Sequence, residues 1–503
     1  RCGGRPVTIH SLFPSVAAQP RPLRPHQEKA LAMLKASLRA GSSRIVVEMP
    51  TGAGKTRFAV EISKGALTKG NRVAFTVPAI SLIDQTVESF ALEGVDDVGV
   101  LQANHERTDY GAPIQICSVQ TLAKRGCPDD FEIVIVDECH IQFDVISEWM
   151  KRCPNTLFVG LSATPWARGM ADDWQDLVSP VSMQELIDQK FMSSFRVYAP
   201  SHPDLSGVGT SKGDYVLNEL SDAMSEGGLV ADIVQTWLQR AEWRPTLVFA
   251  VDRAHAAKLQ AEFQNAGVPM GYCDANVDRI ERRLLFDRMA RGELAGICNV
   301  GTLTTGVDAD IRCIVLARPT KSEILHTQII GRALRTAEGK TEALILDHAD
   351  NHTRLGFVTD IHHPTLLAGK ERNETRRDKG EPMPKECGAC GALKPPRVRE
   401  CPHCGFLPER QSDIEPEAGE LVELKRGKKK SAPTLTEKQT FWSMAKWVDL
   451  DRRKGGRLAK ALYKGKFGVW PRGLSDYPIK PDGEFLSYER SRRIAYAKSQ
   501  ARP

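Results

Sequence analysis

The sequence predicts an α/β protein made of two tandem units, each a parallel sheet with helices on both faces, followed by a small cysteine-rich module and a basic C-terminal region. Short apolar runs alternate with helix-like segments, and this alternation occurs twice along the chain. Strands that are apolar throughout are typical of parallel sheets that helices cover on both faces. A length of 503 residues is enough for about three or four domains.

The first unit, residues 21–182, shows the alternation clearly. Its expected strands are 45–47, 73–77, 114–117, 133–136 and 157–159. Ligands of such sheets bind beyond the carboxyl ends of the strands. Polar motifs that follow 45–47 and 133–136 are therefore expected to meet at one edge of the sheet.

The second unit, residues 183–355, repeats the pattern. Its expected helix at 254–266 should end at Gly267, since glycine readily adopts the left-handed conformation that closes a helix. The other expected helices are 277–291 and 324–334, and the expected strands are 246–250, 296–300, 313–317 and 343–346.

A glycine-containing loop follows the first strand, where residues 50–56 read Pro-Thr-Gly-Ala-Gly-Lys-Thr. The glycines let the backbone turn tightly and direct N–H groups inward, which forms a nest for phosphate oxygens at the start of a helix. Lysine can reach the β- and γ-phosphates, and the threonine hydroxyl can bind Mg²⁺. The consensus sequence of such phosphate-binding loops has glycine at the position where this chain has Met49. The residues expected to bind ATP are Thr51, Gly52, Ala53, Gly54, Lys55 and Thr56, and Thr56 is also expected to bind Mg²⁺.

An acidic pair follows the strand 133–136, where the sequence reads Asp-Glu-Cys-His. Asp137 is expected to hold Mg²⁺, directly or through water. Glu138 is placed to orient or deprotonate the attacking water. Two carboxylates at a strand end are common, but after a phosphate-binding loop they predict the second half of a nucleotide triphosphatase site. The second unit lacks such a loop, so ATP is expected to bind to the first.

These motifs resemble those of superfamily 2 helicases of the DEAD/DEAH type, whose acidic box reads Asp-Glu-x-Asp or Asp-Glu-x-His. Each further motif is weak alone, but together they follow the order of that superfamily. The segments are Leu23–Gln27, Val77–Leu82, Ser118–Leu122, Ser162–Pro165, Gly301–Asp308 and Gln328–Arg335. The resemblance implies two RecA-like lobes with ATP bound between them, and opening and closing of that cleft drives movement along a strand.

The resemblance also assigns roles to single residues. Gln27 is expected to read the adenine base, and the segments at 77–82 and 118–122 are expected to contact nucleic acid. Gly306 and Asp308 are expected to belong to the nucleotide site. The residues expected to couple that site to nucleic acid are Ser162, Thr164 and Gln328.

Two arginines at the end of the last motif are expected to act in catalysis. Charge spreads over the γ-phosphate oxygens in the transition state, and an arginine supplied from a second domain can be worth ~10³–10⁵ in rate. Family resemblance makes Arg335, and secondarily Arg332, the candidates. A lone arginine on a helix is usually a surface residue, but the surrounding motif favours the catalytic interpretation.

Two Cys-x-x-Cys pairs, each followed by glycine, predict a structural Zn²⁺ site with four thiolate ligands. A redox dithiol or a pair of disulfides fits two Cys-x-x-Cys turns less well than a metal site does, and a reducing cytoplasm disfavours disulfides. About 25 residues cannot bury enough apolar surface to fold alone, and structural zinc supplies ~10–16 kcal/mol of apparent binding free energy. The expected ligands are Cys387, Cys390, Cys401 and Cys404.

The C-terminal region carries the positive charge of the chain. Residues 425–503 contain 21 Lys and Arg against 7 Asp and Glu, whereas the whole chain has a net charge of +6, so residues 1–424 carry −8. Aromatic residues are interleaved with these cations, and basic and aromatic side chains together bind unpaired nucleic acid. A small helical domain with an aromatic core and a basic solvated face explains the pattern equally well. Helical spacing is expected at 436–450 and a defined loop at 463–471.

The domain boundaries follow from these segments. The charged stretch around 370–379 is expected to be a linker or an exposed hairpin, although a solvated helix continuing the second lobe fits nearly as well. The expected parts are 1–20, an N-terminal extension; 21–182 and 183–355, the two lobes; 356–384, a charged linker; 385–408, the zinc module; 409–433, a second charged linker; and 434–503, a basic aromatic domain.

The order of two helicase lobes, a cysteine module and a basic tail is similar to that of bacterial RadD-type DNA-repair helicases. It implies an ATP-dependent helicase or translocase that acts on single-stranded or branched DNA in repair or recombination, with a single-strand-binding or nuclease partner. The motifs leave open an RNA-directed helicase, and a motor subunit of a restriction, phage-defence or prophage replication complex. A scaffold with a vestigial ATPase is disfavoured, since the catalytic residues are intact.

No apolar run approaches ~18 residues and no signal pattern is seen at Arg1–Arg5, so we expect no membrane span and a cytoplasmic protein, nucleoid-associated in a bacterium.

Overall fold

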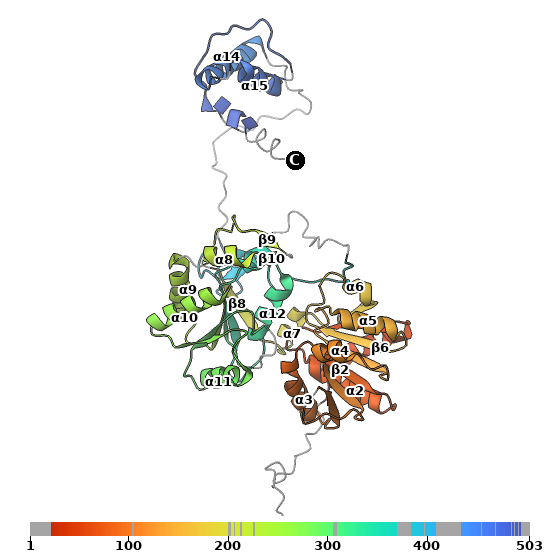
Figure 1. Ribbon diagram of the computed structural model, residues 1–503. Coiled ribbons are helices and arrows are strands. Elements are labelled where there is room, and N and C mark those ends of the chain that lie inside the picture. Colours follow the sequence, from red (N-terminus) through yellow and green to blue (C-terminus); the bar gives the residue numbers. More distant parts are fainter. Residues whose placement is uncertain are drawn as a thin grey trace, which may run out of the picture. The chain divides into compact units, whose positions relative to one another are not determined.

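The computed structural model divides the chain into two compact units, Arg1–Arg410 and Gln411–Pro503 (Figure 1). The first unit contains two α/β halves, which we call the first lobe (residues 25–178) and the second lobe (residues 194–355). The residues that the structure describes are 22–102, 105–199, 203–205, 207–211, 214–224, 227–304, 309–369, 384–396, 398–408, 434–453, 455–467, 469–483, 485–486, 488–490 and 492–493.

The first lobe is built on a seven-stranded sheet in the order β3-β4-β2-β5-β6-β1-β7, and its paired strands are parallel. The expected strands are confirmed, and β3 and β7 extend the two edges. The strands are β1 (Arg44–Glu48), β2 (Val73–Val77), β3 (Val98–Leu101), β4 (Ile114–Ser118), β5 (Ile133–Asp137), β6 (Leu157–Ser162) and β7 (Asp176–Val178).

Alternate residues of each strand point to opposite sides. Because the strands are apolar throughout, both faces of the sheet are apolar and are covered by helices. In β1, Ile45 and Val47 belong to the core beneath α1, α2 and α3, whereas Val46 belongs to the core beneath α4 and α5. The helices are α1 (Pro25–Arg39), α2 (Lys55–Leu67), the 3₁₀ turn η2 (Ile80–Leu82), α3 (Ile83–Leu92), α4 (Val119–Arg125), α5 (Asp144–Arg152) and α6 (Met170–Asp173).

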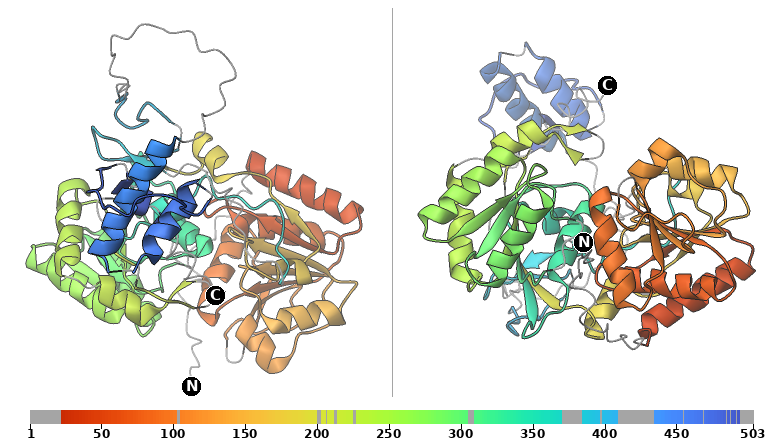
Figure 2. Two further views of the ribbon diagram at one scale, coloured as in Figure 1. Left: turned by 90° about the horizontal axis from the view of Figure 1, so that it is seen from above. Right: turned by 60° about the horizontal axis from the view of Figure 1, so that its bottom comes forward.

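The second lobe is a six-stranded parallel sheet in the order β12-β13-β11-β14-β15-β8. The helices α9 and α10 cover one face, and α11 and α12 cover the other (Figure 2). The strands are β8 (Ser194–Tyr198), β11 (Thr246–Phe249), β12 (Met270–Cys273), β13 (Gly296–Asn299), β14 (Cys313–Leu316) and β15 (Glu342–Asp347), with the hairpin β9 (Thr210–Ser211) and β10 (Asp214–Tyr215) beside them. The helices are α8 (Leu217–Met224), α9 (Gly227–Arg240), α10 (Arg253–Asn265), α11 (Arg279–Ala290), α12 (Glu323–Ala333) and α13 (Asn351–Leu355).

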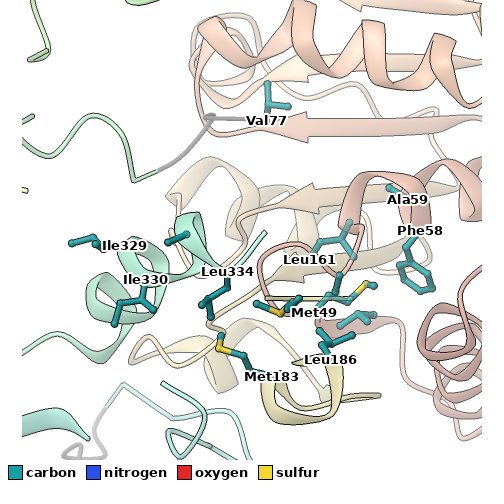
Figure 3. Packing of buried hydrophobic residues seen from close by; sticks show 14 of the residues in the cluster. Met49, Phe58, Ala59, Val77, Leu161, Met183, Leu186, Ile329, Ile330 and Leu334 are labelled. Atoms are coloured by element: carbon teal, nitrogen blue, oxygen red, sulfur yellow. The ribbon is translucent and has the colours of Figure 1, made fainter. Parts of the chain in front are cut away.

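One hydrophobic core is continuous between the two lobes. Helix α7 (Met183–Asp188) connects them and contributes Met183 and Leu186 to this core. Figure 3 shows Leu334, which directly follows α12, beside Met183 and Met49. Burial of apolar area therefore positions α12 of the second lobe against the edge of the first lobe where the phosphate-binding loop begins.

The chain returns to the first lobe after α13. Leu366 packs against the core of α4 and α5, and the backbone N–H of Ala171 donates to the carbonyl of Leu367 at 3.0 Å. His363 stacks on Trp166 with ring centroids 5.0 Å apart. Residues 356–369 were predicted to begin a charged linker, and they are instead folded against both lobes. The charged stretch at 370–383 lies outside the described residues.

The cysteine-rich module packs on the second lobe. Its hairpin consists of β16 (Lys385–Glu386) and β17 (Leu393–Lys394). Ala392 pairs with Tyr198 at the edge strand β8 and is buried in the same core as α9 and α10. The module therefore covers an edge that would otherwise expose unpaired backbone groups.

The second unit is a small helical domain formed by α14 (Leu435–Asp451) and α15 (Arg457–Phe467). The expected helix near 436–450 is confirmed, and Thr434 and Glu437 form a capping box at its start. The loop predicted at 463–471 is wrong in its first half, because residues 463–467 are the last part of α15. Leu462, Tyr463 and Phe467 recur with helical spacing and pack into the core.

No helix in the described part of the chain combines the length and apolar character that a membrane crossing needs.

Candidate nucleotide site and cysteine cluster

The phosphate-binding loop runs from the end of β1 to the start of α2. Gly54 has φ = 86° and caps α2, a conformation that favours glycine. A Cβ at this position would lie 2.5 Å from Nε2 of Gln27, so glycine is needed for space as well. Met49, where the strict pattern has glycine, is fully buried in the core between the lobes. The loop therefore forms without a glycine there.

Three side chains from the start of α1 support the loop from beneath. Gln27 Nε2 donates to the carbonyls of Ala53 (3.1 Å) and Gly54 (3.2 Å). The ring Nε2 of His26 lies 2.9 Å from the Ala53 carbonyl, and the Arg24 guanidinium donates to the Gly52 carbonyl at 3.3 Å. The amide of Gln27 thus fixes the loop, and its role in reading adenine stays a prediction.

Sheet order brings the predicted motifs together. Strand β6 lies between β5 and β1, with Ser162 paired to Glu48 and Leu161 paired to Asp137. All three strands are parallel, so their carboxyl ends share one edge. The loop, the acidic pair and the Ser-Ala-Thr segment therefore lie side by side, and the sequence predicted this meeting for the loop and the acidic pair.

The acidic pair is buried opposite the loop lysine. Lys55 Nζ donates to Oε1 of Glu138 at 3.3 Å. The other oxygen, Oε2, is buried and accepts no hydrogen bond from the described residues, since its neighbour Nδ1 of His140 is engaged with Ser162. Glu138 also has φ = 49°, an uncommon conformation for a residue with a side chain, and such strain clusters at functional sites. A buried acceptor without a donor is suited to bind and deprotonate a water molecule.

The two carboxylates have divergent pKa values. Burial, together with the neighbouring Glu138, raises the pKa of Asp137 to about 7. Burial also acts to raise the pKa of Glu138, but the positive charges of Lys55 and Arg332 hold it below the usual value. Glu138 is therefore ionised at neutral pH and available as a base. A divalent cation beside Asp137 would favour its charged form, so the buried carboxylate fits the Mg²⁺ that the motif implies.

A polar network connects the acidic pair with the second lobe. Burial lowers the pKa of His140, so the ring is neutral at pH 7. Gln328 of α12 donates through Nε2 to Nε2 of His140 at 3.0 Å. With that nitrogen accepting, Nδ1 carries the proton and donates to Oγ of Ser162 at 2.8 Å.

Further contacts of this network reach Thr164 and Glu138. Thr164 donates its backbone N–H to Ser162 Oγ at 3.0 Å, and its Oγ1 lies 3.5 Å from Nε2 of Gln328. His140 Nδ1 lies 3.4 Å from Oε2 of Glu138. Sequence reasoning selected Ser162, Thr164 and Gln328 for coupling but did not select His140, although it stands in the acidic box.

The two predicted arginines come from α12 and the residues after it. Arg332 is buried, donates through Nε to the carbonyl of Thr304 at 2.8 Å, and acts electrostatically on Glu138. The Arg335 side chain lies beside Gly52, where a Cβ would be 3.8 Å from its Cγ. The structure therefore brings Arg332 to the acidic pair and Arg335 to the phosphate-binding loop. Gly306 and Asp308 lie outside the described residues.

Gly331 sets how closely α12 approaches the loop. A Cβ at Gly331 would lie 2.9 Å from Cβ of Thr51, closer than such atoms approach. We expect Gly331→Ala to push α12 from the loop and to lower the ATP turnover rate about tenfold, because misplacement of catalytic groups is costly. Gly65→Ala is the matched control, since nothing lies within 4 Å of that position in α2 and both changes raise helix propensity. Equal turnover of the two variants would contradict this reading of the contact.

The four predicted cysteines form one cluster. Their sulfur atoms all lie within 4.8 Å of one another, with Cys387 Sγ 3.7 Å from Cys404 Sγ and Cys390 Sγ 3.8 Å from Cys401 Sγ. Tetrahedral ligands at a Zn–S distance of about 2.3 Å are about 3.8 Å apart. Backbone N–H groups of Cys390 and Ala389 lower the pKa of Cys387, whereas burial and the neighbouring sulfur atoms raise the pKa of Cys404. The cluster fits a closed, structural Zn²⁺ site.

A phosphate-binding loop and acidic pair on one parallel-sheet lobe, faced by arginines from a second lobe, define a two-lobed nucleoside triphosphatase. Residues 21–167 match the family described as Type III restriction enzyme, res subunit, and residues 229–337 match the helicase conserved C-terminal domain. The chain is a superfamily 2 helicase, a nucleic-acid-dependent ATPase.

Similar proteins come from phages, yeast and bacteria. A 51.5 kDa protein of Lactococcus phage (isolate 7-9) is 28% identical over 470 residues, which are 88% of this chain and 99% of the phage protein. The Saccharomyces cerevisiae protein named as ATP-dependent helicase IRC3 is 28% identical over 373 residues, 69% of this chain and 53% of its own length. This chain thus spans about half of that protein. A fragment of an HsdR subunit of a type I restriction enzyme from Vibrio vulnificus YJ016 has a similar fold, with a TM-score of 0.52, 21% identity, and coverage of 68% and 67% of the two chains.

Proposed function

We propose that this protein is an ATP-driven translocase or helicase that acts on DNA in repair or recombination. The observation that carries the proposal is the contact of Gln328 in the second lobe with His140 beside the catalytic carboxylate at 3.0 Å. A change in the spacing of the lobes alters this contact, so hydrolysis and lobe movement are linked. DNA is favoured because the matched family and the HsdR structure both carry the names of restriction enzymes.

The first lobe would hold ATP and Mg²⁺. In this proposal the N–H groups of residues 51–54 and the start of α2 surround the phosphates, Lys55 neutralises their charge, and Thr56 and Asp137 bind the metal. Glu138 orients the attacking water through Oε2 and takes its proton. ATP is thereby cleaved to ADP and phosphate.

The second lobe would complete the site. Arg335 beside Gly52 is placed to stabilise charge on the γ-phosphate. Arg332, which donates to the carbonyl of Thr304 and acts electrostatically on Glu138, would add to that stabilisation. In the same proposal Gln27 contacts adenine, and Gly306 and Asp308 complete the nucleotide contacts. Hydrolysis then requires both lobes, which makes the rate depend on their closure.

Nucleic acid would contact the segments that follow β2 and β4. These segments lie together, because Gln120 Nε2 donates to the carbonyl of Pro78 at 2.8 Å. Both stand at carboxyl ends of strands, next to the nucleotide edge of the sheet. Most of these contacts would be to the phosphate backbone, in a cytoplasmic protein with access to the nucleoid if the host is a bacterium.

The test is steady-state ATP hydrolysis with single-stranded DNA, duplex DNA and RNA of matched sequence. We expect DNA to stimulate hydrolysis well above the rate without nucleic acid. Stimulation by RNA alone would replace this proposal with an RNA-directed helicase.

A second candidate function is the motor subunit of a restriction, phage-defence or prophage replication complex. The match of residues 21–167 to a restriction-enzyme subunit family and the full-length similarity to a phage protein favour it. Purification from the native host with a tag on this chain distinguishes the two. A nuclease that co-purifies in fixed ratio would support the motor subunit, and its absence would favour the independent enzyme.

A further inference from the structure

Five of the six acidic side chains that the structure describes in the C-terminal domain form hydrogen bonds or ion pairs within it, and Asp451 is exposed. Asp449 accepts hydrogen bonds from the N–H groups of Gly456 and Ala459 at the start of α15. Glu489 is buried and binds the Arg452 guanidinium through both oxygens. The other engaged carboxylates are Glu437, Asp476 and Asp482.

The basic side chains of the same domain are arranged differently. On α15, Arg457, Lys460 and Lys464 are exposed at positions i, i+3 and i+7, which places them on one side of the helix. Leu462 and Tyr463 are buried on the other side. The helix thus presents a row of cations to solvent, about 10 Å long at 1.5 Å per residue. In the described part of the domain none of these three forms a hydrogen bond or ion pair with a carboxylate, although Asp476 lies close enough to Lys460 to feel its charge.

An exposed tryptophan stands beside this row. Trp470 is 53% exposed, and Lys464 Nζ lies 4.3 Å from its ring centroid. The core of the domain contains other aromatic residues, among them Trp442, Tyr463 and Phe485, and Trp470 is not part of it. The sequence left open whether the aromatic residues of the tail build a core or bind a ligand. The structure separates the two groups, and Trp470 is available for a ligand.

We propose that Arg457, Lys460, Lys464 and Trp470 form a binding surface for single-stranded DNA, separate in the chain from the helicase lobes. Cations in a row can contact the phosphates of one strand, and an exposed indole can stack on an unpaired base. In a duplex the bases stack on each other and are not available to Trp470. A duplex would therefore contact the cations alone. The choice of DNA rests on the proposed function. The surface would keep the protein on its strand while the lobes open and close.

The cation row is tested in the full-length protein with a variant that combines Arg457→Ser, Lys460→Ser and Lys464→Ser. Affinity for a fluorescent oligo-dT is measured by anisotropy without ATP over a range of salt. Loss of three phosphate contacts should reduce the salt slope by about 2 and weaken binding about 10- to 100-fold at 0.1 M salt. The matched control is Lys35→Ser, Arg39→Ser and Lys69→Ser, an equal loss of exposed charge on the first lobe. An equal effect of the two variants would overturn the proposal.

Trp470 is tested by Trp470→Ala and Trp470→Phe in the same assay. The alanine variant should bind oligo-dT about tenfold more weakly, the phenylalanine variant should retain most of the affinity, and an abasic strand should not distinguish alanine from the parent protein. Unchanged binding of oligo-dT by Trp470→Ala, or a loss confined to RNA or to duplex DNA, would overturn it. ATP hydrolysis without DNA should be the same in all variants. Absence of DNA-stimulated hydrolysis in the parent protein would instead refute the proposed function and leave the binding result intact.

Discussion

The Glu138→Gln variant is expected to bind ATP as well as the parent protein and to hydrolyse it about 10²- to 10⁴-fold more slowly, the range for loss of a general base. Glutamine has the same shape, so the contact with Lys55 at 3.3 Å and the left-handed backbone at this position are retained. An amide, however, does not accept a proton from water. Turnover is measured as phosphate release, and binding is measured with a fluorescent ATP analogue.

Asp144→Asn is the matched control for this variant. Asp144 is an exposed carboxylate six residues further along the chain, at the start of α5. Its loss should leave both binding and turnover unchanged. Near-normal hydrolysis by Glu138→Gln would refute the assignment of Glu138 as the base, and loss of ATP binding would show that it acts on ground-state affinity instead.

Removal of the four-cysteine metal is expected to unfold the module at residues 385–408. Structural zinc sites supply ~10–16 kcal/mol of apparent binding free energy, and a module of this size has little other means of stabilisation. Cys401→Ser should abolish the stoichiometric zinc measured by mass spectrometry. It should also open the module to protease. Exposure of the β8 edge, which Ala392 now covers, should increase aggregation.

Cys153→Ser serves as the control, because Cys153 is a free cysteine outside the cluster. It should retain zinc and protease resistance. ATP binding should persist in Cys401→Ser, since the residues proposed to hold the phosphates and Mg²⁺ belong to the first lobe. Full retention of the protected module in zinc-free protein would contradict a metal-dependent fold.

The fold class was predictable because β-strands that are apolar throughout have a strong local signature. The strand at 133–137 is followed at once by the acidic pair, so both the element and its chemistry could be read from adjacent residues. The edge strands β3, β7, β8 and β12 were not predicted. Three of them have four residues or fewer, and β8 is only partly buried, so pairing with a distant neighbour rather than local pattern determines them.

The contacts between the lobes could not be read from the sequence either. The contact of His140 with Gln328 joins residues 188 positions apart, and nothing in the local pattern pairs them. Residues 356–369 return to the first lobe because a few apolar side chains such as Leu366 pack there. These side chains stand in a charged segment that contains proline, so they form no recognisable hydrophobic pattern. Glycine and lysine at 464–466 suggested a loop. These residues are helical instead, because Tyr463 and Phe467 on the same helix, α15, pack into the core of the domain.

The central claim is that ATP hydrolysis in the cleft moves this protein along DNA. Displacement of streptavidin from a biotin at either end of a single-stranded oligonucleotide tests it most directly. The account predicts ATP-dependent displacement from one end by the parent protein and none by Glu138→Gln. DNA-stimulated hydrolysis with no displacement from either end, or equal displacement by Glu138→Gln, would contradict it.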